Sequence, residues 1–141
     1  MAPVGYVGFP TLEDLLDGFY GSGTWKAMLL DDSFIPDEHT NEFISDVNIA
    51  EISGDNYSAG GITLTPVVSF NSLTNRYDIT FPQVEVENTT ILAHFVAYYQ
   101  DTGTPATSRI AYINGFGEPV QSTNGTFRAN QSSFSIDFPS S

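Results

Sequence analysis

Apolar and polar residues alternate in several short segments after residue 60, and a period of two predicts β-strands. In "RYDITFP", residues 76–82, the alternation places Tyr77, Ile79 and Phe81 on one face and polar side chains on the other. This segment is the clearest half-buried strand of the sequence. Further strands are expected in the segments "VEVEN", "SRIAYIN", "TFRAN" and "SFSIDF".

Two apolar runs do not alternate, and this is typical of strands that are covered on both faces. They are "TWKAMLL" at residues 24–30, which we expect to be a central strand, and "TILAHFVAYYQ" at residues 90–100. A third apolar segment, "ITLTPVVSF" at residues 62–70, contains Pro66. Because proline cannot donate a hydrogen bond to a neighbouring strand, Pro66 predicts a sheet edge or a β-bulge there.

The segment "TLEDLLDGF", residues 11–19, carries the signals of a short amphipathic helix. Thr11 is the expected N-cap, and Glu13 and Asp14 would lie in the first turn, where the helix dipole favours carboxylates. Gly18 and Gly21 would end the helix after about two turns. Four apolar residues recur at helical spacing and form one stripe: Leu12, Leu15, Leu16 and Phe19.

One early helix followed by seven to nine short strands predicts a mainly β fold. We expect an antiparallel β-sandwich or a jelly-roll-like barrel with a short N-terminal helix. Tight turns are expected at the pairs Asn114-Gly115 and Asn124-Gly125. The expected organisation is an extended arm at residues 1–10 and a single β-rich domain at residues 11–141. The arm, "MAPVGYVGFP", is interpreted either as a disordered tail or as a docking arm.

The charge of the chain limits the classes of molecule that it is expected to bind. Four basic residues stand against 17 acidic ones, a net charge of −13. Nucleic acids and anionic membranes are bound through Lys and Arg, so neither is an expected partner. No secretory signal or transmembrane segment is recognised in the sequence. The chain has no cysteine, which excludes thiolate nucleophiles and thiolate metal ligands.

The stretch "WKAMLLDDSFIPDEHTNEFISD", residues 25–46, concentrates carboxylates around His39. It does not fit a calcium loop, because Pro36 stands where an EF-hand needs glycine. The only other histidine, His94, lies in an apolar run and is expected to be a hydrogen-bonded core residue. We therefore interpret the loop at residues 31–46, the acidic stretch, mainly as a solvated surface, with incidental or structural cation binding as the alternative.

The sequence also lacks the common motifs of catalytic nucleophiles and of phosphate-binding loops. The chain contains neither Gly-x-Ser-x-Gly nor Ser-x-x-Lys, and Gly60-Gly61 is followed by "ITLTP" and not by a phosphate-binding Lys-Ser/Thr. We expect a non-enzymatic protein with no catalytic residue, metal or cofactor. Tyr98 and Tyr99 are neighbours on a strand, so they should point to opposite faces, and at most one could join a sugar-binding platform.

The sequence resembles a family of small phage and prophage proteins encoded among the head genes. The family begins "W…KVMLLD…Y…H.F.SD…E.SG.GY" and ends "Y.DTG…S.LIAYID…P.…G..F.I.W". Corresponding residues here are Trp25, Leu29, Leu30, His39, Phe43, Ser45, Asp46, Glu51, Ser53, Gly54, Tyr57, Asp101, Thr102, Gly103, Ile110, Ala111, Tyr112 and Ile113. The final Trp of the family is absent, and residues 1–10 have no counterpart.

The resemblance implies a capsid decoration, or cement, protein that binds the outer surface of a phage head. The implied partner is the major capsid protein, with self-association as a dimer or trimer. Assembly would take place in the cytoplasm of the bacterial host, and the mature location would be the virion exterior. We assign capsid or subunit contact to six apolar residues: Tyr6, Phe9, Leu12, Leu15, Leu16 and Phe19.

Alternatives remain open at the level of the sequence. One alternative is that the helical stripe serves only to pack on the chain's own sandwich. The whole chain could instead be a carbohydrate- or receptor-binding module of a head fibre or tail, with an exposed aromatic row. A third alternative is a head-completion or tail-tube subunit that forms rings.

Overall fold

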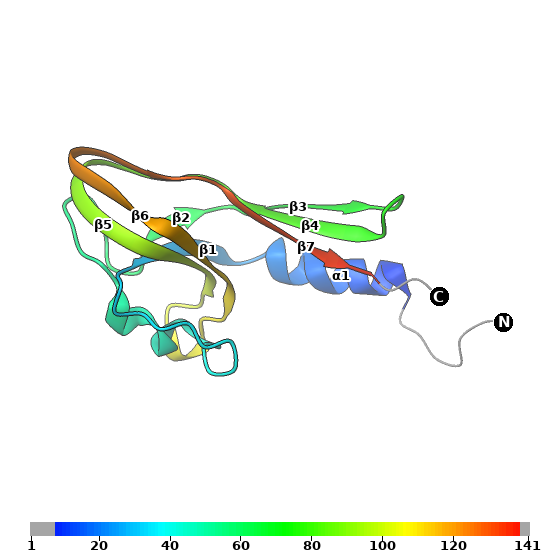
Figure 1. Cartoon of the computed structure of the whole chain (residues 1–141). Helices are drawn as coiled ribbons and strands as arrows, with labels where there is room; N and C mark the ends of the chain where they lie inside the picture. Colours follow the sequence, from blue (N-terminus) through cyan, green and yellow to red (C-terminus); the bar gives the residue numbers. More distant parts are fainter. Residues whose placement is uncertain (1–7, 139–141) are drawn as a thin grey trace.

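The computed structural model describes residues 8–138 and confirms the mainly β class. Two antiparallel sheets and one N-terminal α-helix form a sandwich-like arrangement, which is not a closed barrel (Figure 1). Three short 3₁₀ helices lie in the connections. The helices and strands are α1 (Phe9–Tyr20), β1 (Thr24–Leu30), η1 (Ile44–Asp46), η2 (Asn48–Ala50), β2 (Ile62–Leu64), β3 (Val67–Asn71), β4 (Arg76–Phe81), β5 (Val84–Asp101), η3 (Pro105–Thr107), β6 (Ile110–Ala129) and β7 (Ser132–Asp137).

The strand order is β2-β1-β5-β6 in the larger sheet and β3-β4-β7 in the smaller one. β1 is central, as its apolar sequence predicts, and pairs with β5 along its whole length. β5 and β6 form one long antiparallel pair that reaches from the larger sheet toward the smaller one (Figure 1). In this order β2 and β6 are the edge strands of the larger sheet.

The main core lies between the two sheets and combines aliphatic side chains with several stacked aromatic rings. Phe81 of β4 stacks on Tyr98 of β5, with ring centroids 4.2 Å apart. Phe134 of β7 stacks on Tyr112 of β6 at 4.8 Å. The half-buried strand predicted at residues 76–82 is confirmed, since Tyr77, Ile79 and Phe81 are all fully buried.

A second core covers the opposite face of the larger sheet. Tyr98 points into the main core, whereas its neighbour Tyr99 points into this second core, so the prediction of opposite faces is confirmed. The acidic stretch, which ends in η1, and the following helix η2 supply the covering layer. The buried members of the second core are Met28, Leu30, Phe34, Ile44, Val47, Ala50, Ala97 and Tyr99.

Helix α1 lies along the smaller sheet, beyond the part that the larger sheet covers (Figure 1). Its last residue, Tyr20, is buried against Trp25 at 5.6 Å between ring centroids. The Tyr77 hydroxyl donates a hydrogen bond of 2.5 Å to Asp17 and ties the helix to β4. No helix within residues 8–138 has the length and apolarity needed to cross a membrane.

The start of the helix differs from the prediction. Gly8 is the N-cap and the helix has 12 residues, so Phe9 and Pro10 belong to α1 and not to the predicted arm. Pro10 stands in the first turn, where its missing N–H costs nothing because that group has no partner within a helix. Thr11 is therefore not the N-cap, and Glu13 and Asp14 do not lie in the first turn.

Two local strand predictions need correction. Residues 62–70 do not form one strand: the chain leaves the larger sheet after Leu64 and enters the smaller sheet at Val67, with Pro66 buried between them. The pairs Asn114-Gly115 and Asn124-Gly125 lie inside β6 and make no hairpin turns. The β5–β6 register shows why, because each pair lies beside a register shift.

Two asparagines with a left-handed backbone conformation lie at register shifts of the β5–β6 pair. Asn88 in β5 has φ of 52° and Asn124 in β6 has φ of 47°. Each is an extra residue opposite a shorter segment of the partner strand, as the register from Val86 to Ile91 requires. Asparagine tolerates this conformation better than other residues with a side chain, so it favours a β-bulge as readily as a turn.

A turn at Gly60, followed by Gly61, leads into β2. Gly61 has φ of +103°, and a Cβ atom there would lie 2.0 Å from the carbonyl oxygen of Ala27. Only glycine permits this close approach to β1.

Candidate functional site

The carboxylates of the acidic stretch serve mainly as local turn formers. Asp31 accepts hydrogen bonds from the Ser33 hydroxyl and from the Ser33 N–H, which together lower the pKa of this carboxyl below its ordinary value. Asp37 accepts a bond of 3.0 Å from the backbone N–H of His39. Asp46 accepts bonds of 3.1 and 2.9 Å from the N–H groups of Glu42 and Phe43.

These side chains do not converge on a common point. Within residues 8–138, no three His, Asp or Glu side chains are grouped closely enough to hold a metal ion. The stretch is amphipathic across its length: Phe34 and Ile44 are buried in the second core, whereas Asp32 and Glu38 are exposed. Phe34 and Ile44 cover the larger sheet, whereas Ile35 and most of the carboxylates face solvent.

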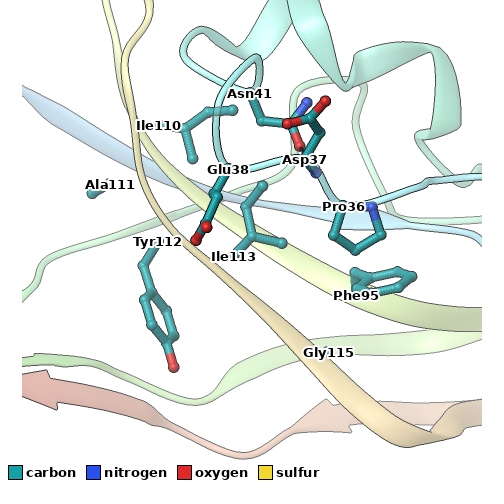
Figure 2. A pocket seen from close by; sticks show the side chains of 10 residues that line it. All are labelled: Pro36, Asp37, Glu38, Asn41, Phe95, Ile110, Ala111, Tyr112, Ile113 and Gly115. Atoms are coloured by element: carbon teal, nitrogen blue, oxygen red, sulfur yellow. Dashed lines mark hydrogen bonds between the residues drawn. The ribbon is translucent and has the colours of Figure 1, made fainter.

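A groove of about 470 Å³ opens where this stretch passes the edge strand β6. One wall is the loop at residues 36–41, and the other wall and floor come from β6 and β5 (Figure 2). The lining residues are Pro36, Asp37, Glu38, Asn41, Phe95, Ile110, Ala111, Tyr112, Ile113 and Gly115.

Packing fixes the walls of this groove. Phe95 contacts Phe34 edge to face at 5.0 Å, and Pro36 lies next to the Phe95 ring (Figure 2). The Asp37 N–H donates a bond of 2.8 Å to the side-chain oxygen of Asn41, which closes the loop on itself. Figure 2 shows the Glu38 carboxylate turned toward β6, over the floor of the groove.

The loop and β6 are joined at one end of the groove. The N–H of Ile110 donates a bond of 3.0 Å to the Glu42 carbonyl, and Phe43 pairs with Arg109 as an isolated bridge. Arg109 also forms an ion pair of 3.0 Å with the Glu42 carboxylate. Beyond this joint the loop and the strand separate, and the groove lies between them.

All four basic residues of the chain are engaged in ion pairs. Each has an N···O distance of 3.0 or 3.1 Å to a different carboxylate. The pairs are Lys26–Asp101, Arg76–Asp137, Arg109–Glu42 and Arg128–Glu85. Within residues 8–138 the other 13 acidic side chains form no ion pair with Lys or Arg, so the net charge of −13 lies on these carboxylates.

A second cavity, of about 330 Å³, lies between β1 and the Gly60 turn. Its polar groups already bond one another. Glu51 accepts a bond of 2.7 Å from the Tyr57 hydroxyl and one of 2.8 Å from the Gly60 N–H. The Tyr99 hydroxyl donates to the Gly60 carbonyl. This network clamps the Gly60 turn against the sheet, and we interpret it as structural.

Burial and hydrogen bonding shift the pKa values of several groups at or beside this cavity, among them Tyr57 and Asp101. Desolvation, with the neighbouring Glu51 carboxylate, raises the pKa of Tyr57 far above its ordinary value, so the phenol remains protonated. The pKa of Asp101 is lowered, chiefly by the Gly103 N–H and then by Lys26. Both shifts accompany satisfied hydrogen bonds, as in a structural network.

The structure places the six predicted contact residues differently from one another. Tyr6 lies outside the described residues. Leu15 is 66% exposed on α1 and is free to contact another molecule. The other four pack, partly buried, against the main core: Phe9, Leu12, Leu16 and Phe19. The helix therefore does pack on its own sandwich, and capsid contact through these residues stays a prediction.

The structure also tests the predictions made for the two adjacent tyrosines of β5 and for His94. Tyr98 and Tyr99 are both buried, so neither offers an exposed aromatic platform. His94 lies partly buried in β5, but its buried Nδ1 atom has no hydrogen-bond partner within residues 8–138, contrary to the partner we expected. The groove itself was not predicted, since no local motif marks Phe95 or Ile113 as neighbours of residues 36–41.

Comparisons with known proteins add no relative. No family model matches the chain, and neither a curated protein nor a solved structure matches it significantly.

Proposed function

We propose that this chain is a structural protein of a phage particle, a capsid decoration protein that binds the outer surface of the head and stabilises it. The observation that carries the proposal is a groove with an apolar floor and a rim of carboxylates on an otherwise acidic sandwich. An apolar depression with a polar rim suits contact with another protein. The sequence resemblance to phage head proteins supplies the particle as the partner.

The charge distribution supports an exterior position. Because every Lys and Arg is paired within the chain, the surface is left with carboxylates that repel DNA and neighbouring particles. Docking would join the groove, and Leu15 on α1, to major capsid protein subunits. Many weak contacts repeated over a symmetric shell, or over dimers or trimers of the chain, yield strong overall attachment.

Adding the purified chain back to particles tests this proposal. Heads are prepared from the encoding phage after deletion of the coding sequence, and bound protein is measured after sedimentation. We expect saturable binding at many equivalent sites and a higher temperature of DNA release from the filled heads. Binding should weaken with added salt, because charge complementarity contributes to it. Absence of binding at low salt would refute the proposal.

A further inference from the structure

We propose that the groove between residues 36–41 and β6 binds an extended segment of the coat subunit, which carries alternating apolar and basic side chains and lies alongside β6 as an added strand. This inference rests on the proposed function only for the identity of the partner. The chemistry of the binding segment follows from the shape, the lining and the charges of the groove.

The backbone of β6 favours an extended ligand. Among the described residues, β6 pairs with β5 on one side and with no strand on the other, and at its first residue the Ile110 N–H already donates to the Glu42 carbonyl. An edge strand presents N–H and C=O groups to an incoming chain, and β-strand addition uses them for affinity. The groove follows β6 from Ile110 to Gly115. At about 3.3 Å per residue, this length accommodates roughly five residues of ligand.

The lining selects apolar side chains on one face of the ligand. Phe95, Ile110 and Ile113 supply the apolar floor. Ile35, next to the groove residue Pro36, is 81% exposed and extends the apolar surface outward. Because successive side chains of a strand point to opposite faces, alternate residues of the ligand would contact this floor.

The carboxylates at the rim of the groove favour basic residues in the bound segment. Asp37 and Glu38 line the groove, and neither forms an ion pair within residues 8–138. A Lys or Arg of the ligand would supply the missing counter-charge. A second copy of this chain is a poor occupant by the same argument, since it carries a net charge of −13 and its four basic residues are already paired.

Selection from a random library of linear twelve-residue peptides tests the chemistry of the ligand. The library is selected on the folded wild-type chain and counter-selected on the variant Asp37→Lys/Glu38→Lys. The matched control Asp55→Lys/Glu87→Lys makes the same charge change at two exposed, unpaired carboxylates outside the groove. We expect enriched peptides that alternate apolar residues with Lys or Arg.

Synthetic versions of the enriched peptides then separate the contribution of the charge pairs from that of the strand hydrogen bonds. Affinity should fall about tenfold or more in the groove variant and change little in the control, because only the groove carboxylates contact the basic residues. N-methylation of alternate peptide nitrogens should abolish binding, since it removes the strand hydrogen bonds. Enriched peptides without basic residues, equal binding by both variants, or binding that survives N-methylation would each overturn the inference.

The source of the segment is tested separately with peptides that tile the coat subunit of the encoding phage. We expect one tile to bind wild type and to compete with the selected peptides. If the library peptides bind as expected but no tile does, the assignment to the coat subunit is wrong while the groove chemistry stands. Add-back to deleted heads then decides the proposed function independently of the groove.

Discussion

At the scale of single residues, the fold depends on buried hydroxyl groups that bridge separate segments. The Tyr57 hydroxyl accepts a hydrogen bond of 3.0 Å from the Leu29 N–H and donates one of 2.7 Å to Glu51. It thereby connects β1, the η2 exit and the Gly60 turn. Tyr98 makes a comparable bond of 2.8 Å to Ser132 across the main core.

Replacing Tyr57 with phenylalanine should destabilise the chain by about 1–3 kcal/mol, because the buried Leu29 N–H then has no acceptor. Chemical denaturation with urea measures this loss. The matched variant is Tyr112→Phe, since the Tyr112 hydroxyl forms no hydrogen bond within residues 8–138 and should change stability by less than about 0.5 kcal/mol. Equal effects of the two substitutions would contradict the assigned network.

The lowered pKa of Asp101 predicts a pH dependence of stability. A carboxyl whose pKa is lower in the folded state stabilises the fold above its unfolded pKa, about pH 4, and loses this contribution as the pH falls through the folded value. Asp101→Asn should therefore reduce stability at pH 7 and make the loss between about pH 5 and pH 2 shallower.

Thermal unfolding followed by circular dichroism across this pH range checks the expectation. Asp32→Asn is the control, since Asp32 is exposed and makes no hydrogen bond within the described residues. A wild-type slope retained by Asp101→Asn would show that Asp101 is not a source of the acid sensitivity.

Residue-level prediction succeeded where periodicity decides the outcome. Alternation placed Tyr77, Ile79 and Phe81 on a buried face, and strand geometry separated Tyr98 from Tyr99. Prediction failed at Asn-Gly pairs, because the same left-handed preference serves a bulge inside a strand as well as a hairpin turn. Which one forms depends on the partner strand, and local sequence does not contain that information.

At the scale of elements, α1 shows how one helix can combine two roles. Leu16 packs against the main core, whereas its neighbour Leu15 is 66% exposed. Deletion of α1 would also remove Tyr20, which is buried in the core. Single substitutions therefore separate folding from contact more cleanly than a deletion does.

Leu16→Ala should destabilise the chain by about 1–3 kcal/mol through lost burial. Leu15→Ala should change stability by less than about 0.5 kcal/mol. If the helix also contacts the capsid, Leu15→Ala should lower head binding at unchanged stability. Urea denaturation and head sedimentation measure the two effects, and a larger stability loss at Leu15 than at Leu16 would contradict the packing.

Most of the strands could be predicted from the sequence, but the way in which consecutive segments connect could not. The apolar runs at residues 24–30 and 90–100 became paired central strands, as expected. However, the separately predicted segments at 84–88 and 90–100 merge into one β5, because the bulge at Asn88 keeps the strand continuous. Pro66, read as an edge or a bulge, marks a transfer between sheets.

At the scale of the whole molecule, the acidic stretch has a packing role that its composition does not indicate. It is a covering layer, with Phe34 and Ile44 beneath and carboxylates outside. Folding brings its residues 36–41 beside Ile110 and Ile113, about 70 positions later in the sequence, to form the groove. No single-sequence pattern reports such a distant pairing, so the groove could only emerge from the structure.

The number of copies per particle tests the central claim most directly. Quantitative mass spectrometry of purified particles from the encoding phage compares this chain with the major capsid protein. As a decoration protein, the chain should be present in hundreds of copies and be accessible to protease or antibody on intact heads. Its absence from particles, or a count of six to twelve, as in a connector or fibre, would contradict the account.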